Sequence, residues 1–81
     1  MQNRIGVIGI VIENLDAVQS VNYILHEHSD IIVGRMGIPY KQKKVSVISL
    51  IVDGQVNDIN SMTGKLGKLK NVSVKAALTK N

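Results

Sequence analysis

The chain has 81 residues, a formal net charge of +4 and no cysteine. This length predicts a single domain over residues 1–81, and the missing cysteines exclude disulfides and thiolate metal sites. Phe and Trp are also absent, so the core has to be built from Val, Ile and Leu, which make up about a third of the chain. That apolar content excludes disorder, and no apolar run approaches the ~18 residues of a membrane span. Without a signal-peptide pattern, a cytoplasmic location is expected.

The first 28 residues predict a strand followed by a helix. Residues 5–12 form a β-branched run interrupted only by glycine, which is typical of a strand buried on both faces. Asn14 or Asp16 can cap the following helix, because a short side-chain oxygen accepts a hydrogen bond from a free N–H of the first turn. Between Asp16 and His28 the apolar residues recur at helical spacing, as a stripe of Val18, Val21, Ile24 and Leu25.

The middle of the chain predicts two strands joined by a polar hairpin. Residues 31–39 form the first, where two glycines suggest a bulge or a close approach of another backbone. Pro39 cannot donate a ladder hydrogen bond, so it marks the strand end or an edge position. Residues 40–44 are the connection, residues 45–52 are the next strand, and Asp53-Gly54 is a turn signal.

The last third predicts a helix and a half-buried strand. The helix covers residues 56–66, and residues 71–78 alternate as a strand does. The helix stripe consists of Val56, Ile59, Met62, Leu66 and Leu69. The element order is therefore βαββαβ, an α+β, ferredoxin-like fold. It has a four-stranded antiparallel sheet, and right-handed crossovers place both helices on one face.

Both inner strands of this predicted sheet are apolar on both faces. One face carries Ile8, Ile10, Ile12, Ile48, Leu50 and Val52, and the other carries Ile5, Val7, Val11, Val45, Val47 and Ile51. Two helices cover only one face, so the other would be a larger aliphatic patch than a monomer normally exposes. The pattern predicts a homo-oligomer and leaves dimer and tetramer open.

The residues that could carry chemistry are sparse. No Ser–His–acid or Cys–His set is present, so an enzyme is not expected. His26 and His28 are two residues apart, which directs their imidazoles to different sides of a helix. We therefore expect no metal there and a helix-end role for them. Gly64-Lys65 lies late in a helix and lacks the hydroxyl residue of a phosphate loop. Gly67 is expected to cap that helix at C′, and Gly64 to allow close packing.

The charges point to two further hypotheses. Arg35 lies in an otherwise apolar strand, where a buried charge would need an acid across an interface or an anionic ligand. Two Arg and four acids give residues 1–40 a net −2, whereas eight Lys and two acids give residues 41–81 a net +6. A polyanion could bind the lysines of the second half, Lys41, Lys43, Lys44, Lys65, Lys68 and Lys70. The inner strands carry no aromatic residue for base stacking, so only weak, nonspecific nucleic-acid binding is expected.

Four sequence blocks, in their order and spacing, resemble the iron-only hydrogenase system regulators. They are Val21-Asn22-x-Ile24-Leu25-His26-x-x-Ser29, Arg35-x-Gly37-x-Pro39, Gly64-Lys65-Leu66-Gly67 and Val72-x-Val74-Lys75. The resemblance covers nearly the whole chain. It implies an ACT-like ferredoxin fold, similar to the C-terminal domain of the nickel-responsive repressor, and a regulatory role.

The resemblance also implies where a ligand would bind. The nickel-responsive domain binds its metal through histidines and a cysteine. This chain has no cysteine, and its two histidines have a different spacing, so neither nickel nor another cofactor is expected. ACT-like relatives place ligands at subunit interfaces, near the first strand-to-helix turn and the second strand. The corresponding candidates are Asn14, Asp16, Arg35 and Gly37. The leading hypothesis is a non-enzymatic, homo-oligomeric regulatory module that binds a small effector or a protein partner. The alternatives are a nucleic-acid-binding regulator with a lysine surface and a metal sensor using His26 and His28.

Overall fold

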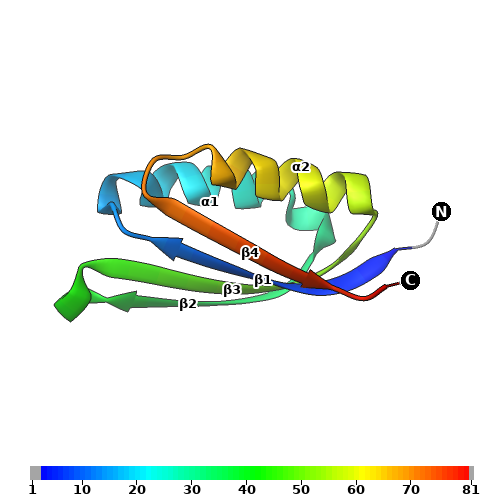
Figure 1. Cartoon of the computed structure of the whole chain (residues 1–81), viewed down its shortest axis with the longest axis horizontal. Helices are drawn as coiled ribbons and strands as arrows, with labels where there is room; N and C mark the ends of the chain where they lie inside the picture. The colour runs from blue at the N-terminus through cyan, green and yellow to red at the C-terminus, as the bar shows by residue number, and fades with distance from the viewer. Residues whose placement is uncertain (1–2, 81) are drawn as a thin grey trace.

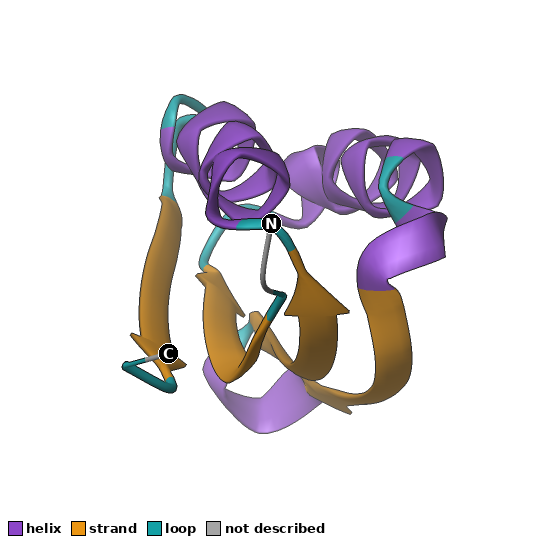
Figure 2. Cartoon of the chain, turned by 90° about the vertical axis from the view of Figure 1, so that its right-hand side faces the viewer, coloured by secondary structure: helices purple, strands orange, loops and turns teal. Residues whose placement is uncertain are grey.

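A computed structural model describes residues 3–80 as a four-stranded sheet with two helices packed on one side (Figure 1). The elements are β1 (Arg4–Ile12), α1 (Val18–Glu27), β2 (Ile32–Tyr40), β3 (Val45–Gly54), α2 (Val56–Gly67) and β4 (Val72–Leu78). Short 3₁₀ turns cover Leu15–Ala17, Ser29–Ile31 and Lys41–Lys43. This confirms the α+β, ferredoxin-like βαββαβ arrangement with both helices on one face (Figure 2).

The strand order is β2-β3-β1-β4, and all neighbouring pairs are antiparallel. β1 and β3 are the inner strands, so the first strand of the chain pairs with both the third and the last. Ile8 lies opposite Leu50 on one side and opposite Ala76 on the other. Since directly paired residues point to the same face, this register fixes which side chains the helices cover.

The core lies between the sheet and the helices. Its fully or nearly buried members come from both inner strands and both helix stripes. They include Ile8, Ile10, Ile12, Ile48, Leu50, Val52, Val21, Ile24, Leu25, Ile59, Met62 and Leu66. The predicted stripes are therefore confirmed at these positions. The other stripe residues, Val18, Val56 and Leu69, are only partly buried, and Leu69 lies beyond the end of α2. Among the described residues, no charged or polar side chain is buried with them.

The first helix begins later than predicted, because a 3₁₀ turn precedes it. Leu15–Ala17 forms a 3₁₀ turn, and α1 begins only at Val18. The Asn14 side chain caps this turn, because its Oδ1 accepts a hydrogen bond of 3.0 Å from the Asp16 backbone N–H. Of the two predicted capping residues, the structure assigns this role to Asn14.

The expectations for the glycines of α2 are wrong. Gly67 is the last residue of α2, and no described glycine has a positive φ. The left-handed residue that turns the chain into β4 is Asn71, at φ 63°. A Cβ on the exposed Gly64 would meet nothing within 4 Å, so no element packs closely there. The close approach is at Gly6 instead, where a Cβ would lie 2.7 Å from the Ala77 carbonyl oxygen.

The glycine and proline signals in β2 are confirmed. The pairing of β2 with β3 shifts between Ile32 and Gly34, which is the expected bulge. Pro39 lies in β2, an edge strand, where a missing ladder donor is tolerated. A Cβ on Gly37 would make only an ordinary contact with Ile48, so this glycine does not reflect a close backbone approach.

Candidate functional site

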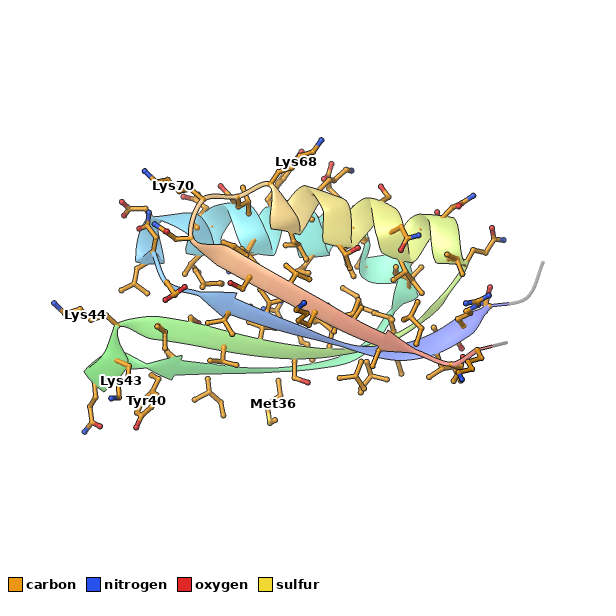
Figure 3. All side chains as sticks on the ribbon, viewed as in Figure 1. Met36, Tyr40, Lys43, Lys44, Lys68 and Lys70 are labelled. Carbon is orange, nitrogen blue, oxygen red and sulfur yellow. The ribbon has the colours of Figure 1, made fainter. Side chains whose placement is uncertain are left out.

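One face of the sheet is not covered by any helix. Eight large apolar side chains, between 37% and 63% exposed, lie on it. These residues, which we call the open face, are Ile5, Val7, Val11, Met36, Ile38, Tyr40, Val47 and Ile51. The register aligns them, since Val47 pairs with both Val11 and Ile38. Met36 and Tyr40 point away from the helices in Figure 3. The predicted second apolar face is therefore present in the folded subunit.

The open face carries little charge. Within the paired strands, the charged residues at its positions are Asp53, opposite Ile5, and Lys75, opposite Gly9. The remaining positions are apolar or small, including Ser49 in the middle of β3. Contiguous exposed apolar area of this kind is uncommon on soluble monomers.

A second feature is a hollow between α1 and the edge strand β2. It is about 360 Å³ in volume and opens to solvent. We call it the α1–β2 groove, and its lining residues are Asn22, Leu25, His26, Ser29, Ile32 and Arg35. Arg35 pairs with the buried Leu50, so its side chain leaves the sheet on the helix side. There its Nη2 donates a hydrogen bond of 3.1 Å to the Asn22 Oδ1.

Arg35 is not buried within the single subunit, and its pairing with an acid across an interface stays a prediction. The side chain is exposed, because β2 is the outermost strand and its middle lies beside α1 without being covered. Across residues 3–80, no carboxylate lies within ion-pair distance of its guanidinium. The partner that the structure provides is the neutral amide of Asn22.

The four predicted ligand residues fall into two separate pairs. Asn14 and Asp16 share the 3₁₀ turn after β1, whereas Arg35 and Gly37 lie on the helix side of β2. Arg35 is level with Leu50 and hence with Ile8, four residues before the end of β1. At ~3.3 Å per strand residue this is an offset of roughly 13 Å along the strands from the end of β1, and β2 is also separated from β1 by β3. One subunit does not bring the two pairs together, and ligand binding by these residues stays a prediction.

Three polar residues of the groove were not among the four predicted effector-binding residues, although the sequence had offered one of them, His26, as a metal ligand. Asn22 and His26 lie one turn apart on α1, and Ser29 lies in the 3₁₀ turn that follows α1. The spacing of Asn22 and His26 is itself a signal of a shared helix face. Their position beside Arg35 depends on how α1 crosses the sheet, which the sequence does not show.

The two histidines occupy different surroundings. His26 lines the α1–β2 groove, while His28 Nδ1 lies 2.9 Å from the Ile24 carbonyl oxygen one turn earlier. In the part of the chain that the structure describes, no three His, Cys, Asp or Glu side chains form a metal-binding group. The structure thus places the two rings apart, and their role stays open.

Some of the lysines lie toward one end of the molecule, whereas Lys68 lies nearer its middle (Figure 3). Lys43 and Lys44 extend from the β2–β3 hairpin, and Lys70 lies in the α2–β4 connection at the same end (Figure 3). Glu13 lies close to Lys70 in this region, since its backbone N–H donates a 2.8 Å hydrogen bond to the carbonyl of the next residue, Asn71. Lys65 belongs to another region, where its Nζ lies 3.8 Å from Glu27 Oε1 in a solvent-exposed pair.

The structure is thus a small ferredoxin-like module with one uncovered apolar sheet face and a solvent-open groove beside α1. Over residues 4–76 the sequence matches the TM1266-like family, described as the iron-only hydrogenase system regulator, and the chain belongs to this family. The structure of uncharacterized protein TM1266 from Thermotoga maritima superposes with a TM-score of 0.92. It is 30% identical, and the match covers 98% of this chain and 100% of that one.

More distant solved structures share only the fold. An unknown protein from Galdieria sulphuraria has a TM-score of 0.71 at 8% identity, covering 99% of this chain and 47% of its own. A formyltetrahydrofolate deformylase from Pseudomonas putida KT2440 has a TM-score of 0.69 at 6% identity. That match covers 95% of this chain and 29% of the deformylase. None of the curated proteins matches the chain. Neither α1 nor α2, the α-helices of the described part, has the length and apolar character needed to span a bilayer.

Proposed function

We propose that the chain is a non-enzymatic regulatory module of an iron-only hydrogenase system. In this proposal it works as a homo-oligomer and binds a small effector or a protein partner. The regulatory role is supported by the family to which the chain belongs. The open face is the single structural observation that supports association, because it leaves eight large apolar side chains in contact with water.

A second copy of the chain is the occupant that the open face fits best. Fully burying a Val, Ile or Met side chain contributes about 1.5–3 kcal/mol. The eight side chains are about half exposed, so covering them contributes on the order of 8 kcal/mol per subunit. Two copies therefore gain enough to offset an association cost of ~4–15 kcal/mol. Opposite charges at Asp53 and Lys75 also allow identical faces to meet without like-charge repulsion.

The surroundings of the polar side chains support a binding role over a catalytic one. The described hydrogen bond of a histidine ring goes from His28 to the backbone of Ile24. Nucleophilic catalysis would require a ring that contacts a hydroxyl and is oriented by a third group. Ser46, Ser49 and Ser73 lie instead within strands.

The regulatory proposal predicts that hydrogenase activity depends on this chain. Deleting its gene from the source cells should change iron-only hydrogenase activity, and the wild-type gene should restore it. A gene carrying Val47→Asp, which charges the open face, should not restore it. Tyr23→Asp is the matched control, because Tyr23 is 65% exposed on α1 and lies outside both the open face and the α1–β2 groove. Unchanged hydrogenase activity after deletion would contradict the proposal.

Nucleic-acid binding is a second candidate, favoured by Lys43, Lys44 and Lys70 at the hairpin end. We expect the isolated chain to bind duplex DNA weakly, because only phosphate contacts are available. Its affinity for DNA should fall as the salt concentration rises. A gel-shift assay at physiological salt, with the region upstream of the hydrogenase genes, measures this. Tight binding that resists competitor DNA would place this candidate ahead of the effector-binding proposal.

A further inference from the structure

We propose that the α1–β2 groove binds a small aliphatic carboxylate. The inference rests on the proposed function, since it names the chemical class of the effector. It places recognition on Asn22, His26, Ser29 and Arg35, beside a floor of Leu25 and Ile32.

The charge of Arg35 is the first argument. Its guanidinium is exposed within the groove and has a neutral amide as its partner, 3.1 Å away. Ion pairs elsewhere in the described chain do not involve it. A guanidinium presents a planar fork of donors, and a carboxylate matches this fork with two parallel hydrogen bonds.

The position of Arg35 is the second argument. Asn22 lies on α1, which is anchored in the core by Val21 and Leu25. Because its amide oxygen accepts from the Arg35 Nη2, the guanidinium is held at the groove before any ligand arrives. A side chain that is already ordered loses less conformational entropy on binding.

The remaining lining residues select the rest of the ligand. His26 and Ser29 each offer a donor and an acceptor to a second polar group. Leu25 is 2% exposed and Ile32 is half-buried, so the floor suits an aliphatic segment. One cation and an apolar floor match a monoanion with a short carbon chain better than a doubly charged phosphate.

The size of the groove sets the scale of the ligand. At about 360 Å³ it lies near the lower end of the range for small-molecule sites, which is about 300–1,000 Å³. The groove is open to solvent, so we expect fast exchange.

The test is a titration of the isotopically labelled full chain, followed by amide NMR shifts. The probes are acetate, propionate and butyrate, with their three neutral amides and inorganic phosphate as comparisons. We expect the carboxylates to give saturable shifts localised to α1 and β2, with tighter binding as the carbon chain lengthens. The amides should give none.

Two substitutions at Arg35 separate charge from geometry. Arg35→Gln should raise the Kd for butyrate by about 10- to 100-fold, the range for losing a hydrogen bond to a charged group. Arg35→Lys keeps the charge without the planar fork of donors, so its Kd for butyrate should lie between those of the wild-type chain and Arg35→Gln. Both should keep the fold, because Arg35 is exposed. Lys43→Gln is the matched control, since it removes one positive charge from the hairpin, outside the groove.

Several outcomes would overturn the assignment. Amide shifts that do not saturate, or that map to the lysine hairpin, would do so. Equal losses of butyrate affinity in Arg35→Gln and Lys43→Gln would do so too, as would tighter binding of phosphate than of butyrate at the groove. If carboxylates fail to bind while hydrogenase activity still depends on the gene, the groove is wrong and the regulatory role stands. Groove binding without that dependence would contradict the regulatory role alone.

Discussion

Val47→Asp is expected to separate the assembled protein into folded single subunits. Val47 lies at the centre of the open face, paired with Val11 on one side and Ile38 on the other. It is 39% exposed in the isolated subunit, so an aspartate there can remain hydrated once the subunits separate. In the assembly the same carboxylate would be buried without a partner.

Val47→Asp is expected to cause a large loss of association free energy, because a two-fold symmetric interface would contain the substitution twice. Each uncompensated buried charge costs about 3–5 kcal/mol, and a two-fold interface contains the substitution twice. We expect dissociation at micromolar concentrations, where the wild-type chain stays assembled. Light scattering gives the mass, and far-UV circular dichroism shows that the subunit remains folded.

Leu15→Asp is the control for Val47→Asp, since it adds the same charge at an exposed apolar residue outside the open face. It should leave the mass of the assembly unchanged. A wild-type protein that already has the mass of one chain would contradict the association argument. Assembly of Val47→Asp with unchanged mass would show that copies meet through another surface.

Leu66→Ala is expected to lower the free energy of unfolding by about 2–5 kcal/mol, the range for large-to-small changes in a core. Leu66 is fully buried on the stripe of α2 that faces the sheet. The substitution leaves a cavity in the core. Because the helices cover only one face of the sheet, the core is small and few neighbouring side chains can move to fill that cavity. For a domain whose total stability is roughly 5–15 kcal/mol, this is a large fraction.

Urea unfolding measures this change, at several protein concentrations so that association and folding are separated. Leu15→Ala is the control, because truncating an exposed leucine should shift stability by no more than about 0.5 kcal/mol. A comparable loss in both variants would mean that the core is not where the structure places it.

The sequence predicted the architecture because burial in this fold is periodic. Alternation of two residues separates Ile8 from Val7, and Leu50 from Ile51, and the structure places each on its expected face. The stripes at Val21 and Ile59 follow the helical period in the same way. Faces that repeat along an element are therefore visible before any tertiary contact is known.

Features that depend on how two elements cross were not predictable. The exposure of Arg35 follows from the place of β2 at the edge of the sheet and from its distance to α1. Gly6, not Gly64, meets a neighbouring backbone, and only the pairing of β1 with β4 determines this. The α1–β2 groove combines residues from a helix, a turn and a strand. Neither the two-residue alternation of strands nor the 3.6-residue repeat of helices therefore predicts which residues line it.

The pairing of β1 with β4 also orders events during protein synthesis. Ile5 accepts a backbone hydrogen bond from Thr79, 74 residues away along the chain, so the central strand gains its second neighbour only when the last strand has been made. Contacts this distant in sequence slow folding, because the closing of a long loop precedes any gain from the new contacts. Until then one edge of β1 is open, with Val7 and Val11 beside it. A nascent chain therefore keeps one edge of its most apolar strand unpaired until β4 has been made, and an unpaired strand edge makes it prone to aggregate during that time.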